Sequence, residues 1–364
     1  VPDVVHDTVV AYLDFERRIG GYEAMAAYAD KLSHVKTQLA DLIGAAPEEV
    51  ALAESQTVAW NRLFWGLQFK KGDIILTATA SYGSNFLAFM QARDHFGAEI
   101  QVVPSTPYGE IDLDALKAAI TPRVKLIALT HIPTFGGLVN PAEEVGQIAR
   151  QAGIPYLLDA CQSIGQYPLD VEKLGCDMMT GTGRKYLRAP RGTGFAYVRK
   201  DFLDQLEPLG PDLLSADWLE SGSEYQLKPD ASRFEYFEHS RALKLGFGEA
   251  CAYAHRVGMD RIWGRICTLS ASLRAQLQAL PKVELKDQGQ GHQSGIVTFT
   301  VKDRTPGEVQ AHLAAFKINI SLAGAFAARL DMGPRGIEWM LRASVHYMNT
   351  EEEVLELVER VGEL

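Results

Sequence analysis

Residues 156–198 read YLLDACQSIGQYPLDVEKLGCDMMTGTGRKYLRAPRGTGFAYV, and they contain two apolar runs that each lead to a charged side chain. The first run, at residues 156–158, is followed directly by Asp159. The second run, at residues 178–179, leads through small residues to Lys185. Such runs are typical of buried strands in a parallel sheet, where ligands bind beyond the carboxyl ends of the strands. The stretch therefore predicts a site at one sheet edge that contains Asp159 and Lys185.

The segments before this stretch alternate between strand and helix patterns. Short apolar runs begin near residues 50, 74, 99, 124 and 156, and segments with helical spacing separate most of them. A β-α-β series of this kind is typical of a mostly parallel sheet covered by helices. We therefore predict an α/β fold for the large part of the chain.

Three other regions complete the expected architecture. Residues 1–50 show mostly helical spacing, and residues 242–280 are helical again. Residues 200–235 are irregular and rich in Pro, Gly and Asp, so we predict a long loop there. The tail contains two strand patterns and a final helix that begins with a capping box at Thr350 and Glu353. This tail is predicted to form a small α+β unit.

The length and charge of the chain limit its organisation and partners. At 364 residues it exceeds what one core usually serves, so we expect a large domain at residues 20–240 and a small domain at residues 1–19 and 241–364. Lys and Arg total 36 against 46 acidic residues, which argues against nucleic acid or an anionic membrane as the main partner.

The cysteines and the apolar runs indicate the compartment. No apolar run approaches the length of a membrane helix, and the first residues lack a secretory signal pattern. The four cysteines form no C-x-x-C pair, so neither a zinc site nor a redox motif is indicated. We expect reduced thiols and a cytoplasmic protein. These cysteines are Cys161, Cys176, Cys251 and Cys267.

A lysine and a buried carboxylate at one sheet edge suit a lysine-tethered cofactor, pyridoxal 5'-phosphate (PLP). The lysine forms a Schiff base, and the carboxylate keeps the pyridine nitrogen protonated so that the ring accepts electrons. We assign these roles to Lys185 and Asp159. Gln162 follows Asp159 by one short turn and is expected at the ring hydroxyl. Thr182 and Arg184 are expected at the phosphate.

Several of these residues have a plainer interpretation when each is taken alone. The basic residues between 184 and 191 also suit a solvated surface, where most Lys and Arg side chains lie. Ser55 and Thr57 at a helix start are first of all cap residues, although the free N–H groups of such a turn also bind phosphate. The combination of residues, rather than any one of them, supports the cofactor hypothesis.

Seven motifs now support a family resemblance, and they occur in the family's order. The chain resembles the class V aminotransferase family, the branch with cysteine desulfurases, selenocysteine lyases and isopenicillin N epimerase. The similarity covers nearly the whole chain from about residue 44. It implies the PLP-dependent fold called type I, a homodimer and bound PLP. The motifs are SQTVAWN (55–61), SYGSN (81–85), THIPTFGGLVNP (130–141), LLDACQ (157–162), GTGRKYLRAPRGTG (181–194), FEYFEHS (234–240) and LRASVHYMNT (341–350).

Position by position, the resemblance implies a role for each matching residue. Tyr82 stands where desulfurases place a histidine stacked on the cofactor ring, and Thr134 stands near the ring oxygen. Arg342 matches the arginine that binds the substrate carboxylate, which suits an amino-acid substrate. Catalytic roles fall on Lys185 and Asp159. The complete set of implied cofactor contacts is Gln56, Thr57, Tyr82, Thr134, Asp159, Gln162, Thr182, Arg184 and Lys185.

Two departures from the desulfurase pattern bear on the reaction. Desulfurases carry a mobile cysteine before the LRAS motif, whereas residues 321–339 here read SLAGAFAARLDMGPRGIEW and no cysteine follows Cys267. A persulfide route is therefore not expected. The second departure is FEYFEHS at residues 234–240, where desulfurases have a Gly-Thr-Pro turn that reaches the partner subunit's phosphate. We expect this bulky, acidic stretch to shape the substrate pocket.

The sequence thus favours a PLP-dependent C–S lyase that acts on a cysteine-derived amino acid by β-elimination. It looks closest to lyases that cleave a substituted cysteine or its sulfoxide, such as hercynylcysteine sulfoxide lyase. An aminotransferase or amino-acid epimerase with the same cofactor is one alternative. A catalytically degenerate binding protein of the same fold is another. The sequence does not name the substrate or its leaving group.

Overall fold

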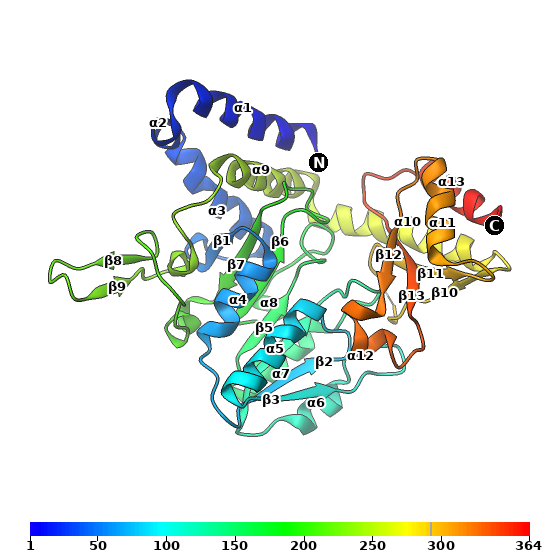
Figure 1. The fold of residues 1–364 in the computed structure, drawn as a ribbon, viewed down its shortest axis with the longest axis horizontal. Helices are drawn as coiled ribbons and strands as arrows, with labels where there is room; N and C mark the ends of the chain where they lie inside the picture. Colours follow the sequence, from blue (N-terminus) through cyan, green and yellow to red (C-terminus); the bar gives the residue numbers. More distant parts are fainter. Residues whose placement is uncertain (292) are drawn as a thin grey trace.

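A seven-stranded sheet forms the centre of the large part of the molecule in the computed structural model, which describes residues 1–291 and 293–364 (Figure 1). Its inner strands are parallel, and β7 runs antiparallel to both of its neighbours. This confirms the predicted mostly parallel sheet. The strand order is β1 (Val50–Ala53), β7 (Gly194–Val198), β6 (Met178–Thr182), β5 (Tyr156–Asp159), β4 (Val124–Thr130), β2 (Ile74–Ala78) and β3 (Glu99–Val103).

The ends of three neighbouring strands bring polar residues to one edge of this sheet. Strands β4, β5 and β6 are parallel, and Asp159 pairs in register with Thr130 on one side and Thr180 on the other. The chain leaves β6 at Thr182 and reaches Lys185 three residues later. The predicted edge site therefore has its carboxylate and its lysine beyond adjacent strands.

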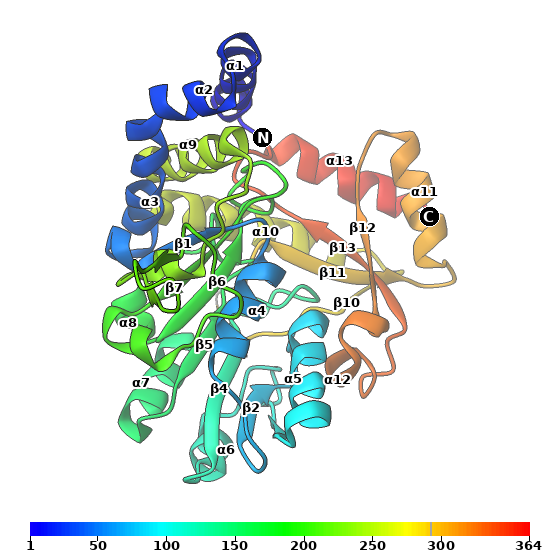
Figure 2. The same ribbon diagram turned by 60° about the vertical axis from the view of Figure 1, so that its left-hand side comes forward.

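Helices bury both faces of the sheet, which explains the continuous apolar runs of its strands. Successive residues of β5 point to opposite faces, so Leu157 packs with α4 and α5 while Leu158 packs with α7. Figure 2 shows α4 and α5 over one face of the sheet. The helices of the β-α-β part are α4 (Gln56–Gly66), α5 (Gly83–Phe96), α6 (Leu113–Ala119), α7 (Ala142–Ala152) and α8 (Val171–Leu174), and a short 3-10 turn, η1 (Pro47–Glu49), precedes β1.

The predicted N-terminal helices are present as α1 (Asp3–Ile19), α2 (Gly21–Ala27) and α3 (Ala29–Ile43). Helix α9 (Arg241–Val257) packs against both α1 and α3. The helical stretch at residues 242–280 is divided by Gly258, whose φ of 93° ends α9 before α10 (Met259–Gln278) begins.

A second, four-stranded antiparallel sheet forms the C-terminal α+β unit. Helices α10, α11 and α13 pack around it, and the Thr350–Glu353 capping box at the start of α13 is confirmed. The predicted domain boundaries at residues 19/20 and 240/241 stay a prediction. The elements of this unit are β10 (Val283–Leu285), β11 (Ile296–Val301), α11 (Pro306–Ala315), β12 (Ser321–Gly324), η4 (Ala325–Ala327), α12 (Arg329–Met332), β13 (Trp339–Ser344) and α13 (Glu351–Gly362).

The prediction of a long loop at residues 200–235 is wrong in part. The segment contains 3-10 turns η2 (Lys200–Gln205) and η3 (Ala231–Phe234), and between them a hairpin of β8 (Ala216–Trp218) and β9 (Tyr225–Leu227). Figure 1 shows that this hairpin projects from the body of the molecule. Its strands are three residues long and mostly exposed, so they carry no alternating apolar pattern that a sequence could reveal. Within the described residues, the helices all fall short of the length and apolarity that a membrane span requires.

Candidate active site

Asp159 ends β5 and is 1% exposed, and two donors hold its carboxylate. Nδ2 of Asn85 donates to Oδ2 at 2.7 Å, and the backbone N–H of Cys161 donates to Oδ1 at 2.9 Å. Burial raises the pKa of Asp159, while these two donors and the positive charge of Lys185 oppose that rise. A buried carboxylate of this kind is stabilised in its charged form by a cation placed beside it.

Gln56 lies behind this carboxylate rather than at an open surface. It is buried, and its Nε2 donates to Oδ1 of Asn85 at 3.3 Å and to Oγ1 of Thr180 at 3.4 Å. Thr57, the next residue, is exposed in the first turn of α4, whose cap is Ser55. The structure thus gives Gln56 a supporting position and leaves Thr57 at the surface. Their predicted contacts with a cofactor stay predictions.

Lys185 is half-buried in the turn after β6, and its amine faces an aromatic ring. The Nζ atom lies 5.8 Å from the centroid of the Tyr82 ring. The charge of Lys185 acts on both Asp159 and Cys161, so the three side chains share one region. Burial nevertheless raises the pKa of the Cys161 thiol to about 11. The predicted pair of lysine and carboxylate therefore comes together with the predicted stacking residue.

A chain of polar contacts joins three more of the predicted residues. Nε2 of Gln162 donates to Oγ1 of Thr134 at 3.0 Å, and Nη1 of Arg342 donates to the carbonyl oxygen of Thr134 at 3.3 Å. Arg342 comes from β13 of the C-terminal unit, so this contact brings the two sheets together at the site. Thr134, from the loop after β4, is the link between them.

A cavity of about 160 Å³ lies beside Lys185 and is rich in basic and polar side chains. Within the described part of the chain, the buried Nε of Arg342 has no hydrogen-bond partner. Burial also lowers the pKa of this guanidinium, as expected for a cation held away from water. Both features suit an anionic ligand. The lining residues are Gln162, Arg184, Lys185, Tyr186, Arg188, Arg342, Ser344 and His346.

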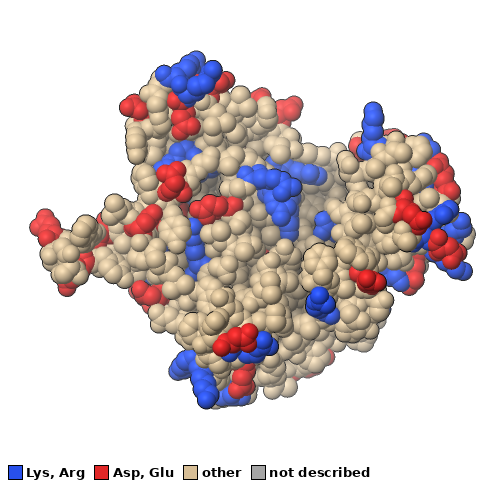
Figure 3. Space-filling view, in the orientation of Figure 1, with Lys and Arg blue, Asp and Glu red and all other residues tan. Residues whose placement is uncertain are grey.

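The two residues predicted at the phosphate differ in their surroundings. Thr182 is buried, and its Oγ1 donates to the carbonyl oxygen of Thr193 at 3.2 Å. Arg184 is exposed and lines the cavity beside Lys185. Figure 3 shows Lys and Arg side chains gathered around the hollow between the two sheet units. The phosphate roles of both residues stay predictions.

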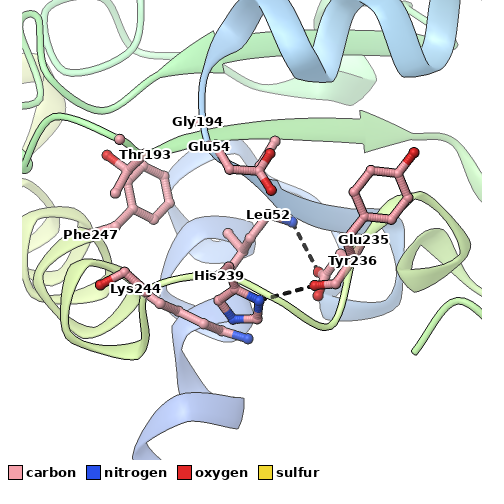
Figure 4. A pocket seen from close by; sticks show the side chains of 12 residues that line it. Leu52, Glu54, Thr193, Gly194, Glu235, Tyr236, His239, Lys244 and Phe247 are labelled. Atoms are coloured by element: carbon pink, nitrogen blue, oxygen red, sulfur yellow. Dashed lines mark hydrogen bonds between the residues drawn. The ribbon is translucent and has the colours of Figure 1, made fainter. Parts of the chain in front are cut away.

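The stretch at residues 234–240 lines a different cavity within the chain (Figure 4). Glu235 is buried, where it accepts a hydrogen bond from the backbone N–H of Leu52 at 2.9 Å and forms an ion pair with Lys36 at 2.9 Å. Nδ1 of His239 donates to the carbonyl oxygen of Tyr236 at 3.0 Å, as Figure 4 shows. The residues that line this cavity differ from those around Lys185. Glu235 therefore stabilises β1 at its third residue, Leu52. The expected influence of residues 234–240 on the substrate pocket stays a prediction.

Asn85 is the site residue that sequence reasoning missed. It belongs to the SYGSN motif, three residues after Tyr82, in the first turn of α5. An asparagine there reads as an ordinary residue of a helix start. Its side chain instead points to the sheet edge, because α5 begins directly beside Asp159.

Comparisons with known proteins identify the family of the chain. The family profile described as Aminotransferase class-V matches residues 1–357. The chain belongs to the class-V aminotransferase family. A probable cysteine desulfurase of Methanothermobacter thermautotrophicus is 30% identical over 351 residues, which cover 95% of this chain and 86% of that protein.

Solved structures of related proteins share the fold. The apo structure of a cysteine desulfurase from Thermococcus onnurineus NA1 matches with a TM-score of 0.89 and 27% identity, over 98% of this chain and 91% of that one. The cystine C–S lyase C-DES, in complex with cysteine persulfide, matches with a TM-score of 0.89 and 22% identity, over 100% of this chain and 95% of that one. The fold is thus the PLP-dependent type I fold, and the chain is a PLP-dependent enzyme.

The residues around Lys185 fit the cofactor of this family. The amine of Lys185 is available for a Schiff base, and the ring of Tyr82 presents a flat face near it. The buried carboxylate of Asp159 suits a protonated pyridine nitrogen. The Nε of Arg342, which has no hydrogen-bond partner among the described residues, suits a further anionic group, such as the carboxylate of an amino acid.

Proposed function

We propose that this enzyme is a C–S lyase that acts on a cysteine-derived amino acid without a persulfide cysteine. The observation that carries the proposal is the segment that faces Tyr82. Residues 325–328 read AFAA, and the backbone of Ala327 lies against Gly83, beside Tyr82. A sulfur-accepting thiol is absent from this segment, so we infer that sulfur leaves with its substituent as a thiol.

The reaction breaks the Cβ–S bond of the substrate. The Cα proton is removed, the sulfur leaves with the electron pair of the broken bond and takes up a proton, and one water is consumed. The products are a thiol, pyruvate and ammonium. PLP supplies a ring that withdraws electrons from Cα when the substrate amine is attached to it.

The chain's own residues orient the substrate and move its proton. Lys185 would tether the cofactor and would serve as the base that takes the Cα proton. Asp159 would hold the pyridine nitrogen in its protonated form. Arg342 would fix the substrate carboxylate and so direct the Cα–H bond toward Lys185. Tyr82 would cover the ring face.

The test is to incubate the enzyme with S-substituted cysteines and to measure pyruvate and ammonium. We expect both products from at least one such substrate, and none from Lys185→Ala. Lys173→Ala is the matched control, because Lys173 is an exposed lysine on α8. Borohydride reduction followed by peptide mass analysis should find the cofactor on Lys185. Attachment at another lysine would refute the assignment.

The same experiment separates the alternatives. An aminotransferase would convert the bound cofactor to its amine form with an amino donor alone. An epimerase would exchange the Cα proton for solvent deuterium without release of ammonium. Either result in the absence of pyruvate would replace the lyase proposal.

We also propose that the enzyme is a homodimer, as the family resemblance implies. Large apolar side chains on the projecting hairpin support this, since Trp218 is 71% exposed and Tyr225 is 55% exposed. Sedimentation equilibrium should give twice the chain mass. A monomer at micromolar concentration would contradict the proposal.

A further inference from the structure

An apolar groove borders Tyr82 and shares no lining residue with the basic cavity beside Lys185. Its volume is about 410 Å³, within the usual range for small-molecule pockets. One wall is the face of α5 that carries Phe86, Leu87 and Met90. The opposite wall is the segment from Phe326 to Leu330. Among the described residues that line it, Arg329 is the one with a charge.

The two walls are held close together at one end. A Cβ atom added to Gly83 would come within 2.9 Å of the carbonyl oxygen of Ala327, so only glycine permits this approach without a shift. The small side chains of Ala327 and Ala328 then leave the space between α5 and Phe326 open. The groove is therefore built by close backbone contact at its end and small residues along its side.

The groove leaves large apolar side chains in contact with water. Leu87 is 62% exposed and Phe326 is 67% exposed, and they line the groove from opposite walls. Such a patch next to a binding site indicates that an apolar group covers it. Covering both side chains would favour binding in proportion to the apolar area removed from water.

Tyr82 connects this groove to the proposed reaction centre. Its ring lies 5.8 Å from Nζ of Lys185, and the same residue lines the groove. A substrate with its carboxylate at Arg342 and its Cα beside Lys185 also carries a sulfur-containing side chain on Cα. That side chain needs a cavity of its own. The basic cavity around Lys185 and Arg188 is small and polar, whereas the groove is larger and apolar.

We propose that this groove is the subsite for the sulfur substituent of the substrate, and that it takes an apolar group, aromatic or branched aliphatic. The inference rests on the proposed C–S lyase function and names its substrate class. The natural substrate is then an S-conjugate of cysteine with a bulky apolar substituent, and its leaving group is the corresponding thiol.

The test compares S-benzyl-L-cysteine with S-methyl-L-cysteine. We expect the wild-type holoenzyme to prefer the benzyl substrate in kcat/KM by about tenfold or more, the scale on which apolar pockets discriminate. Leu87→Glu and Phe326→Glu should abolish this preference by lowering kcat/KM for the benzyl substrate about tenfold or more. Both positions are exposed, so the variants should fold. Leu355→Glu is the control, because Leu355 is 47% exposed on the remote helix α13.

A binding measurement makes the subsite testable apart from turnover. The holoenzyme is titrated with each conjugate while the absorbance of the bound cofactor is recorded. Each titration gives the dissociation constant of one conjugate. We expect tighter binding of the benzyl compound, and loss of that difference in Leu87→Glu and Phe326→Glu. Pyruvate release without any size preference would overturn the subsite and keep the lyase. If neither conjugate yields pyruvate, the lyase fails, and a benzyl preference in binding that the variants lose would still support the subsite.

One further outcome would assign the groove to another occupant. If Leu87→Glu or Phe326→Glu changes the sedimentation of the protein, a second copy of the chain covers these side chains. That result would overturn the subsite proposal. We expect both variants to sediment like wild type.

Discussion

Asn85 anchors Asp159, because its Nδ2 donates to Oδ2 of that carboxylate at 2.7 Å. The Oδ1 atom of the same amide accepts a hydrogen bond from Nε2 of Gln56 at 3.3 Å. The second contact fixes which end of the Asn85 amide faces the carboxylate. All three side chains are buried, so water does not replace a lost partner easily. Residues from α4 and α5 thus orient Asp159.

Asn85→Ala should weaken cofactor binding without removing the tethering lysine. A hydrogen bond to a charged group contributes about 1.5–3 kcal/mol, so we expect the dissociation constant for PLP to rise roughly ten- to hundredfold. Fluorescence titration of the apo-protein with PLP measures this change. Gln56→Ala should have a smaller effect in the same direction, because it acts through Asn85.

Gln91→Ala is the matched control for Asn85→Ala, since Gln91 lies on the exposed side of the same helix. It should bind PLP like wild type. Equal affinities for Asn85→Ala and wild type would show that the backbone N–H of Cys161 alone orients Asp159.

The sequence predicts the carboxylate and the lysine well because both follow from strand ends. Parallel strands finish at one edge, so residues just after β5 and β6 must lie near each other. Helix starts carry less information. Gln56 and Thr57 are adjacent in the first turn of α4, yet one is buried behind Asp159 and the other is exposed. Their opposite orientations depend on how α4 packs, which one sequence does not reveal.

Other features depend on contacts between distant segments. Asn85 and Asp159 are 74 positions apart in the sequence, so the residues around either one give no sign of their contact. The groove beside Tyr82 requires α5 and the segment before β13 to pack together at Gly83, and the sequence of each wall looks ordinary. The short strands β8, β9, β10 and β12 have too few residues to show a period of two.

Arg342→Ala should raise KM for a cysteine conjugate and leave the absorbance of the resting holoenzyme unchanged. Loss of a charged hydrogen-bonding partner costs about 2–5 kcal/mol, so we expect kcat/KM to fall by roughly thirtyfold or more. Arg342→Lys should recover part of the loss in kcat/KM, because lysine keeps the positive charge but lacks the paired N–H donors of the planar guanidinium. Arg256→Ala, at an exposed ion pair with Glu249, is the control. A normal KM for Arg342→Ala would place the substrate carboxylate elsewhere.

Cys161 should remain a neutral thiol during the reaction. Burial raises its pKa to about 11, so the thiolate is scarce at neutral pH despite the nearby charge of Lys185. We expect iodoacetamide to modify Cys161 slowly at pH 8 and faster as the pH approaches 11. Cys161→Ala should release pyruvate within about twofold of the wild-type rate, because the thiol is not a sulfur acceptor.

Peptide mass analysis after turnover provides the second measurement for Cys161. The peptide that contains it should gain no sulfur atom. The half-exposed Cys267 serves as the comparison thiol in the same digest. A persulfide on Cys161 would contradict the proposed lyase and indicate a desulfurase route through this position.

His346 should make stability depend on pH through its contact with the backbone beside Lys185. Its Nε2 donates to the carbonyl oxygen of Tyr186 at 2.9 Å, and its Nδ1 accepts from the backbone N–H of Met348 at 3.3 Å, so the neutral ring satisfies both contacts. Burial lowers the pKa of His346 from 6.5 to about 4. The unfolded chain therefore binds one more proton than the folded chain between these values, and stability is full above about pH 6.5 and falls toward pH 4. One such group changes the free energy of unfolding by up to about 1.4 kcal/mol per pH unit.

Urea unfolding, followed by the fluorescence of the buried Trp60, should show this dependence of the unfolding free energy on pH. His346→Gln should make the slope shallower without abolishing it, because burial lowers the pKa of His131 to about 4 as well. His95→Gln, an exposed control on α5, should leave the slope unchanged, and an unchanged slope in His346→Gln would refute the assignment.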